Sequence, residues 1–338
     1  MEEKAFWSKA KVAVIGAGNF GTVLASLVSK NCLQVRLLSR SEEQARAINS
    51  TRLNPSYMTK LSLAQNITAF SEPERVFEGG VQAVIWALPS QVCRQEAKVL
   101  APYFGGDEIL IHTVKGVEEG SLKRISVLLR EEIPCPRIGV ISGPNLAEEI
   151  GRGEPAATVV ASDFEEVVAA GQALLTGDYF RVYPGHDVIG VEWAGALKNI
   201  LAIAAGAVES LQLGWNARAL LITRGLAEMV RFGMAMGAKE ETFLGLSGVG
   251  DLLATCSSPL SRNYRTGLRL AKGESLDSIL QALGSVAEGV KTTRSVREFA
   301  HAHGIDMPVT EGVYHLLEGK LSLQEIIQLL MTRPTARP

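Results

Sequence analysis

The sequence lacks the features that mark several classes of protein. Only four of its 338 residues are cysteines, and no two are close enough to form a Cys-x-x-Cys pair, so neither a disulfide framework nor a zinc cluster is indicated. We expect free buried thiols in a reducing compartment. The five histidines have no metal-ligand spacing, and no Gly-x-Ser-x-Gly elbow or Ser/His/Asp set is present. We therefore expect chemistry without a metal.

A basic excess and long apolar runs are also missing. Lys and Arg number 34 against 36 Asp and Glu, a formal charge of −2, which argues against a nucleic-acid binder. The longest apolar stretch, 193–208, contains Lys198 and Asn199 and falls short of the roughly 18 clean apolar residues of a membrane span. The first eleven residues hold charges and no apolar core of a signal peptide. We expect a cytoplasmic protein that does not span a membrane.

A chain of 338 residues exceeds the size at which one hydrophobic core usually divides, so we expect two domains, 1–189 and 190–338. The first half alternates short, continuously apolar runs with helical stretches, as in a mostly parallel, doubly wound sheet covered by helices. The second half consists of Ala-, Leu- and Gly-containing helical segments and predicts an all-α domain. The predicted strands are 12–15, 35–38, 81–88, 109–113, 137–141 and 158–161, with a helix at 22–30. The clearest helices of the second half are 188–210, 217–236, 275–283 and 290–303.

A glycine-rich loop follows the first predicted strand. Gly16, Gly18 and Gly21 form G-x-G-x-x-G with a strand before them and a helix after them, the context of a dinucleotide-binding loop. In such a loop the glycines allow a tight turn, the approach of a pyrophosphate and close helix packing. A purely structural turn is the alternative.

The end of the second predicted strand bears on which nucleotide binds. An NAD-selective site normally has an acidic residue there, whereas this chain has Ser39 and Arg40. Arg40 suits a 2′-phosphate, so NADPH is favoured and NADH remains possible. The alternative is that Arg40 is a solvated loop cation.

Two lysines stand out in unusual positions. Lys115 directly follows a predicted strand end, where ligands of open α/β sheets bind, although it could be an exposed loop lysine. Lys198 lies within a strongly apolar helix, and burial lowers a lysine pKa toward values that suit proton transfer. A lysine whose ammonium reaches solvent from a core helix is the alternative.

A third polar cluster follows the glycines of residues 248–250. Asp251 and Thr255 are four residues apart and share a face if the segment is helical, although Asp251 could instead cap the helix. Arg262 offers the planar fork that binds phosphate, and Asn263 adds a donor. A surface arginine is the alternative for Arg262.

These blocks closely resemble the bacterial NAD(P)-dependent glycerol-3-phosphate dehydrogenases over residues 11–317. Besides the glycine loop, the matching blocks are 48–57, 88–90, 115–118, 142–144, 190–199, 222–228, 248–252, 261–263 and 288–289. The chain departs from the usual family pattern at Phe20, which replaces Trp, and at two short segments. Leu38-Ser39 replaces Trp-Ala and keeps the arginine, and Asn145-Leu146 replaces Ser-Phe.

The resemblance implies a Rossmann domain followed by a 6-phosphogluconate-dehydrogenase-like helical domain, and a homodimer. It implies reduction of dihydroxyacetone phosphate to sn-glycerol 3-phosphate for glycerophospholipid synthesis, with Lys198 as the proton-transfer lysine. The remaining implied catalytic residues are Lys115, Asp251 and Thr255. The implied substrate contacts are Lys115, Gly143, Asn145, Lys198, Asn199, Asp251, Ser261, Arg262 and Asn263. The implied cofactor contacts are Gly16, Gly18, Asn19, Phe20, Gly21, Arg40, Tyr57, Pro89, Lys115, Ala147, Arg262 and Glu288.

Two other functions fit parts of the pattern. One is another dehydrogenase of the same layout, acting on a 3-hydroxyacid or on 6-phosphogluconate. The other is a dinucleotide sensor without catalysis, which has no need of a lysine within an apolar helix.

Overall fold

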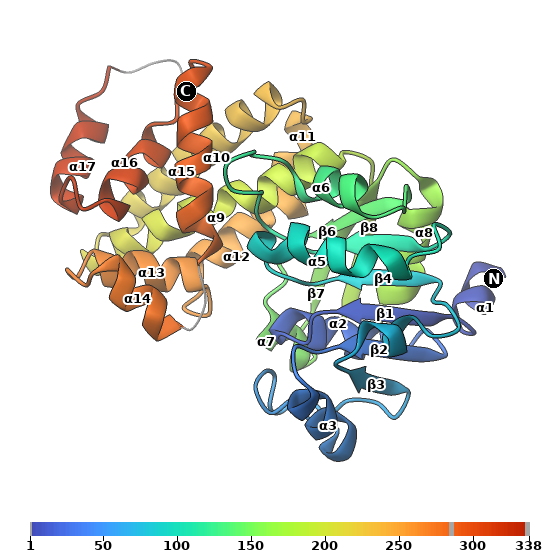
Figure 1. Cartoon of the computed structure of the whole chain (residues 1–338). Coiled ribbons are helices and arrows are strands. Elements are labelled where there is room, and N and C mark those ends of the chain that lie inside the picture. The colour runs from blue at the N-terminus through green and yellow to red at the C-terminus, as the bar shows by residue number, and fades with distance from the viewer. Residues whose placement is uncertain (1, 284–286, 335–338) are drawn as a thin grey trace. The chain divides into compact units, whose positions relative to one another are not determined.

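The computed structural model describes residues 2–283 and 287–334, and the chain forms two compact units (Figure 1). The first comprises residues up to 118 together with 123–192, and the second comprises 119–122 and the residues from Trp193 onward. The boundary predicted after residue 189 falls in the first turn of a long helix, α9, and the last four residues of the predicted second domain, 335–338, lie outside the described residues.

The first unit is built on one eight-stranded sheet with the order β3-β2-β1-β4-β5-β6-β7-β8. All neighbouring strands are parallel except β6 and β7, which are antiparallel. The first six positions have the doubly wound order, so the predicted fold class is confirmed. The strands are β1 (Lys11–Ile15), β2 (Gln34–Leu38), β3 (Ile67–Phe70), β4 (Ala83–Trp86), β5 (Ile109–His112), β6 (Ile138–Ser142), β7 (Ala156–Ser162) and β8 (Phe180–Gly185).

Helices cover both faces of this sheet and bury alternate residues of each strand. In β1, Val12 and Val14 join one apolar cluster with helices α2 and α8, while Ala13 and Ile15 join a second cluster with α4, α5 and α6. This alternation explains why the central strands read as continuously apolar. The helices are α1 (Glu2–Trp7), α2 (Asn19–Ser29), α3 (Glu42–Thr51), α4 (Pro73–Phe77), α5 (Cys93–Leu100), α6 (Ile125–Glu132), α7 (Ala147–Gly151) and α8 (Glu165–Leu175), with short 3-10 turns at Ser90–Val92 and Ala101–Tyr103.

The sequence prediction missed the two edge strands. In β3, buried and half-buried residues alternate, and in β8 the buried Phe180 and Val182 alternate with exposed residues. Such half-buried strands lack the apolar run that identified the central ones. The predicted strand 81–88 is shorter, at Ala83–Trp86, and the helix predicted at 22–30 begins at Asn19, directly after the glycine loop.

The regular elements among the described residues of the second unit are all helices, as predicted, and the longest is α9 (Val188–Ser210). By length and composition α9 could cross a membrane, but most of it is buried inside the protein, as in a core helix. The other helices are α10 (Trp215–Ala235), α11 (Glu240–Leu244), a π-helical turn (Leu246–Gly250), α12 (Asp251–Ser257), α13 (Arg262–Leu270), α14 (Leu276–Leu283), α15 (Glu288–Ala302), α16 (Pro308–Leu317) and α17 (Leu323–Met331).

Helices α9 and α13 touch backbone to backbone through two glycines. A Cβ added at Gly206 would lie 1.9 Å from the Tyr264 carbonyl oxygen, and one added at Gly267 would lie 1.8 Å from the Ile203 carbonyl oxygen. Any side chain at either position would force the helices apart, because real Cβ contacts are never this short.

Candidate active site

The glycine loop connects β1 to α2, and its three glycines are required for different reasons. Gly16 has φ +107°, and a Cβ there would lie 2.8 Å from the Ala87 oxygen. A Cβ at Gly21 would lie 1.8 Å from the Gly16 oxygen, so this glycine lets the helix lie against the loop. Gly18 has a negative φ, and no atom lies within 4 Å of its added Cβ. The chain's own packing therefore does not require glycine at position 18, whereas the close approach of a ligand to the backbone would.

The space beside Gly18 lies at the N-terminus of α2. The first turn of this helix contains no acidic side chain, and no side chain caps it, so its N–H groups suit an anion such as a pyrophosphate. Asn19 is exposed in this turn, and Phe20 is half-buried against the core. This geometry fits a dinucleotide.

The loop after β2 contains the two residues expected near the ribose. Ser39 is buried, and its hydroxyl lies 3.0 Å from the Ser41 oxygen and 3.2 Å from the Phe70 oxygen, so it holds the loop itself. Arg40 is exposed beside it. An exposed arginine here is compatible with a 2′-phosphate and with a solvated cation, so the choice between NADPH and NADH stays a prediction.

The parallel strands bring further predicted residues to the same edge of the sheet, because their carboxyl ends coincide. Pro89 follows β4 and is exposed, Ala147 begins α7 after β6, and Tyr57 is half-exposed in the segment after α3. The Pro89 oxygen accepts a bond from the Cys93 thiol at 3.3 Å. These positions are compatible with cofactor contacts.

Lys115 is not a solvated loop lysine. Its Nζ donates to the Gly143 carbonyl oxygen at 2.9 Å, which joins the loops that follow β5 and β6. A Cβ at Gly143 would lie 2.9 Å from the Ala157 oxygen, so the close fit requires glycine. Asn145 is tied to β7, since its Nδ2 donates to Ala157 and its Oδ1 accepts from the Thr158 hydroxyl at 2.9 Å.

In the second unit a buried ion pair joins α9 to α12. Lys198 is 5% exposed and Asp251 is 1% exposed. The Lys198 ammonium lies 2.6 Å from Asp251 Oδ1 and 2.6 Å from Thr255 Oγ1. Neither alternative from the sequence holds: Lys198 does not extend to solvent, and the capping position of α12 is Gly250, without a side-chain cap.

The local sequence explains how Asp251 reaches the lysine. A π-helical turn, residues 246–250, precedes α12, and such turns are frequent at functional sites. A Cβ at Gly248 would lie 2.0 Å from the Phe243 oxygen, so only glycine allows this turn to lie against the end of α11. Asp251 and Thr255 then share one face of α12, as their spacing predicts.

This cluster is equipped for proton transfer. A lysine ammonium is an acid with movable protons, and the adjacent carboxylate stabilises its charge away from water. The neighbouring thiol is no rival nucleophile, because burial raises the pKa of Cys256 to about 12. Within residues 2–283 and 287–334, no group of three His, Cys, Asp or Glu side chains could hold a metal ion.

The residues predicted to bind phosphate have unequal roles. Arg262 is exposed in the first turn of α13, where its guanidinium can reach a ligand. Ser261 caps this helix, and its hydroxyl accepts from the Tyr264 N–H at 3.3 Å. The buried Asn263 bridges Asn199 and Gly289, with Nδ2 donating to Asn199 Oδ1 at 2.8 Å and Oδ1 accepting from the Gly289 N–H at 3.1 Å.

The Asn263 amide thus joins α9, α13 and α15. Asn199 also donates to the Gly195 oxygen at 3.3 Å. Glu288 begins α15 next to Gly289, at the helix end that Asn263 secures. Both amides hold the helices together, so a direct contact of either with substrate stays a prediction.

The sequence reasoning missed a buried carboxylate in the first unit. Glu192 accepts from the Ser126 N–H at 2.8 Å, from the Ser126 hydroxyl at 2.6 Å and from Arg124 at 2.5 Å, and its Oε1 lies 3.2 Å from His112 Nε2. Burial alone would raise the pKa of Glu192, but His112, Arg124 and Ser126 hold it down at about 2. The sequence signal that could have identified Glu192 is a charged residue within an apolar helix.

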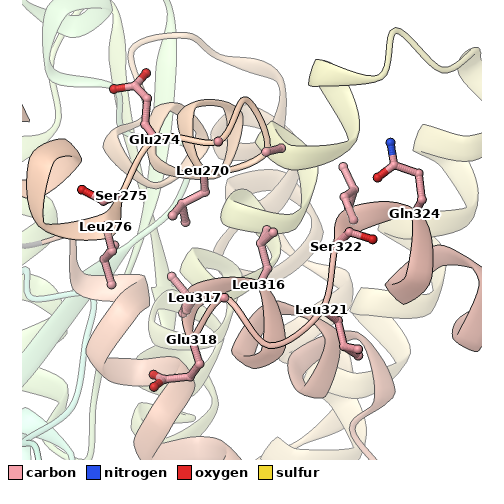
Figure 2. Close-up of a pocket in the computed structure, with 14 residues that line it drawn as sticks. Leu270, Glu274, Ser275, Leu276, Leu316, Leu317, Glu318, Leu321, Ser322 and Gln324 are labelled. Atoms are coloured by element: carbon pink, nitrogen blue, oxygen red, sulfur yellow. The ribbon is translucent and has the colours of Figure 1, made fainter.

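A cavity of about 480 Å³ lies elsewhere in the second unit, between the turn that joins α13 to α14 and the turn that joins α16 to α17 (Figure 2). Six of its fourteen lining residues are leucines, and Glu274 and Glu318 lie at its margin. Each carboxylate is already paired, Glu274 with Arg269 and Glu318 with Arg294. None of the predicted site residues lines this cavity.

Comparison with known proteins supports the resemblance. The family model described as the NAD-dependent glycerol-3-phosphate dehydrogenase N-terminus matches residues 11–168, and the one described as its C-terminus matches 187–328. A glycerol-3-phosphate dehydrogenase [NAD(P)+] of Moorella thermoacetica is 43% identical over 327 residues, 96% of this chain and 97% of the relative. One of Pseudomonas paraeruginosa is 45% identical over 322 residues, 95% of this chain and 94% of the relative.

A solved structure is similar over the same length. The crystal structure of glycerol-3-phosphate dehydrogenase from Coxiella burnetii has a TM-score of 0.90 and 36% identity, and the match covers 96% of this chain and 99% of that one. A ketopantoate reductase from Ralstonia eutropha, at 18% identity and a TM-score of 0.60, shares the fold. The chain belongs to the NAD-dependent glycerol-3-phosphate dehydrogenase family.

Proposed function

We propose that this protein is an NAD(P)-dependent oxidoreductase that reduces dihydroxyacetone phosphate to sn-glycerol 3-phosphate, in which Lys198 supplies the proton. Membership of the family supports the activity, and the names of its relatives give the substrate and both nucleotides. The single observation that carries the assignment of residues is the buried contact of Lys198 with Asp251 and Thr255.

The bound NAD(P)H supplies the hydride. The Lys198 ammonium polarises the substrate ketone and gives a proton to its oxygen as negative charge develops there. Asp251 accepts a hydrogen bond from Lys198 and holds the ammonium in one orientation, and the Thr255 hydroxyl fixes it from a second direction. Once its proton has left, the neutral amine remains beside a carboxylate, which favours its reprotonation.

Substrate binding needs a fixed phosphate, because a carbonyl held in place converts a bimolecular encounter into an oriented one. Arg262 is the residue suited to this, since its guanidinium can donate two parallel hydrogen bonds to phosphate oxygens. Asn263 and Ser261 hold the first turn of α13 and thereby the base of Arg262. Lys115, Gly143 and Asn145 are the substrate contacts we propose in the first unit.

The edge of the sheet supports the proposed contacts of the first unit with the cofactor. Gly18 and the N-terminus of α2 would bind the pyrophosphate, and Arg40 the ribose side, with NADPH preferred and NADH accepted. Further proposed contacts are Asn19, Phe20, Tyr57, Pro89, Lys115, Ala147, Arg262 and Glu288.

The test is loss of nicotinamide absorbance with dihydroxyacetone phosphate, measured in parallel with NADH and NADPH. We expect turnover with both nucleotides and a higher kcat/KM with NADPH. A parallel panel of a 3-hydroxyacid and 6-phosphogluconate, assayed with the oxidised nucleotides, should give no turnover. Oxidation of either would indicate another dehydrogenase of this layout, and nucleotide binding without any turnover would indicate a sensor.

We also propose a homodimer. Helix α10 exposes Trp215, Leu220 and Met234, which are 81%, 48% and 52% accessible in the single chain. A second copy would cover this apolar face, which spans most of the helix. Light scattering should give twice the mass of the chain, and Leu220→Glu should give the monomer mass. A wild-type monomer at micromolar concentration would contradict the proposal.

The cellular role follows from the product. We propose a cytoplasmic enzyme that supplies sn-glycerol 3-phosphate to glycerophospholipid synthesis. Depletion of the protein in its host should lower the glycerophospholipid content, and supplied glycerol 3-phosphate should restore it. Unchanged lipid content after depletion would contradict this role.

A further inference from the structure

We propose that Asn54 is a positioning residue for the dinucleotide, and that together with Gln44 it holds the glycine loop in its binding conformation. This inference rests on the proposed function, because it concerns the same nucleotide site. Asn54 is fully buried, in the segment between α3 and β3. It lies outside every set of cofactor contacts given above.

The Asn54 amide donates to two parts of the loop. Its Nδ2 lies 2.9 Å from the Ala17 carbonyl oxygen and 2.8 Å from the Thr22 hydroxyl. Ala17 stands between Gly16 and Gly18, and Thr22 lies in the first turn of α2. One side chain therefore joins the middle of the glycine loop to the start of the helix that follows it.

The same amide accepts from two further segments. Asn54 Oδ1 lies 3.1 Å from Gln44 Nε2, 3.2 Å from the Ser56 nitrogen and 3.3 Å from the Tyr57 nitrogen. Tyr57 is one of the proposed cofactor contacts. Asn54 thus connects the segment of Tyr57 to the glycine loop without contacting a ligand itself.

Gln44 extends the connection to the loop after β2. Its Nε2 donates to the same Ala17 oxygen at 3.0 Å, and its backbone N–H donates to the Ser41 hydroxyl, which caps α3, at 3.3 Å. Ser41 directly follows Arg40. Two side-chain amides therefore fix the glycine loop relative to the loops of Arg40 and Tyr57.

The two bonds to Ala17 also orient the next peptide N–H. The described chain has no cis peptide, and in a trans peptide the C=O and the following N–H point in opposite directions. Because Asn54 and Gln44 hold the Ala17 oxygen on their side, the Gly18 N–H is turned to the other side. A pyrophosphate is bound by such backbone N–H groups, so a loop fixed in advance loses less freedom when the nucleotide binds.

Three variants test the inference. Asn54→Asp keeps the size and the acceptor oxygen but removes the amide donors to Ala17 and Thr22. Gln44→Ala removes one bond to Ala17 from a half-buried helix position where the fold should survive. The matched control is Asn49→Ala. The Asn49 amide also lies on α3, but its 2.8 Å bonds go to both backbone groups of Ala69, in β3, and not to a cofactor segment.

The readouts are the Kd of NADPH by nicotinamide fluorescence, the melting temperature, and KM and kcat for each substrate. We expect Gln44→Ala and Asn54→Asp to raise the Kd and KM of NADPH about fivefold or more, the scale of one net hydrogen bond. The kcat and the KM of dihydroxyacetone phosphate should stay within about twofold, since proton transfer is untouched. Asn49→Ala should lower the melting temperature with the Kd of NADPH unchanged.

The outcomes separate this inference from the proposed function. Wild-type protein that binds and oxidises NADPH, with Gln44→Ala and Asn54→Asp behaving as Asn49→Ala does, would overturn the role of Asn54 and leave the function standing. Wild-type protein that binds neither NADH nor NADPH would overturn both. A proportional fall of kcat in the two variants would also overturn the positioning role, because it would indicate a general loss of active protein.

Discussion

The two units bury charge in different ways. In the first unit the Glu192 carboxylate is surrounded by Arg124, Ser126 and His112, with donors that include a backbone N–H. In the second unit the Lys198 ammonium is bound to the Asp251 carboxylate and to the Thr255 hydroxyl, both on α12. The first arrangement neutralises a carboxylate whose low pKa keeps it ionised, which suits a structural joint. The second presents an ammonium, whose protons can move, which suits chemistry.

A third buried charge, Glu228, forms no ion pair with the cations that the structure describes. Glu228 on α10 accepts from the backbone N–H groups of Val309 and Thr310 and from the Thr310 hydroxyl at 3.0 Å, and so caps α16. Burial raises the pKa of Glu228 to about 7 despite these bonds and the nearby charge of Arg231. Glu192, by contrast, has an arginine and a histidine beside it as well as hydrogen bonds, and its pKa is lowered.

Replacing Lys198 should have the largest effect on activity. Lys198→Ala should lower kcat by about 10²–10⁴, the usual scale for a lost proton-transfer group. Lys198→Arg should be similarly slow while it keeps a charge beside Asp251, because a guanidinium does not release its proton. Steady-state kinetics and circular dichroism check both variants. Near-normal turnover in either would remove Lys198 from the mechanism.

Replacing Glu192 should lower stability strongly and activity only slightly. Glu192→Ala leaves buried donors without an acceptor and should lower the free energy of unfolding by about 3–5 kcal/mol. The kcat per folded molecule should change by less than about threefold. Urea denaturation and active-site titration separate the two quantities. If Glu192→Ala lowered kcat as much as Lys198→Ala does, Glu192 would not be a purely structural residue.

The lowered pKa of Glu192 also predicts how the stability of the first unit depends on acid pH. The folded pKa of Glu192, about 2, lies below its ordinary value of 4.5. Its contribution to stability is therefore complete above pH 4.5 and is lost as the pH falls toward 2.

Replacing the exposed Arg262 should affect substrate binding, unlike replacement of the buried charges. Arg262→Ala should raise the KM of dihydroxyacetone phosphate about 10- to 100-fold, the scale of a charge-assisted contact, and should leave the melting temperature nearly unchanged. Inorganic phosphate should inhibit the wild type more strongly than the variant. Unchanged kinetics with the phosphorylated substrate would refute the assignment.

Glu228 gives the smallest effect, a dependence of stability on pH. Its folded pKa, about 7, lies above its ordinary value of 4.5, so between these values the folded protein binds a proton that the unfolded chain has released. The free energy of unfolding should therefore decrease from pH 5 to pH 8, by on the order of 2 kcal/mol. Denaturation of wild type and Glu228→Gln across this range tests it. The variant should show the weaker slope, and equal slopes would contradict the shift.

The sequence predicted the strands that are buried on both faces of the sheet. The strands of Val12, Val35 and Ile109 each lie between two neighbouring strands, and their largely apolar runs fit burial on both faces. The edge strands β3 and β8 escaped prediction because half of their residues face outward. Helix α2 was predicted three residues late, since its first turn is the end of the glycine loop.

The site shows a similar limit. The apolar surroundings of Lys198 indicated a buried lysine. Asp251 lies 53 residues further along the chain, so the resemblance placed the two in one site but spacing could not, and the contact itself comes from the fold. Thr255 was predictable from its spacing to Asp251 on one helix. Ser261 and Asn263 look like ligand contacts in the sequence. In the structure the Ser261 hydroxyl caps its own helix, α13, and the Asn263 amide bonds to α9 and α15. Asn54 gave no signal of its role, because its five partners come from four segments of the chain.

The glycine contact between α9 and α13 has a consequence for altering the enzyme's selectivity. At Gly206 and Gly267 the backbones of α9 and α13 are in direct contact, with no side chain between them that could change conformation if one helix moved. A substitution that tilts α13, the helix of Arg262, will therefore also press on the backbone of α9, the helix of Lys198. A wider choice of substrates is therefore better sought by reshaping the loops around this pair of helices than by moving the helices that carry the proposed proton donor and the proposed phosphate ligand.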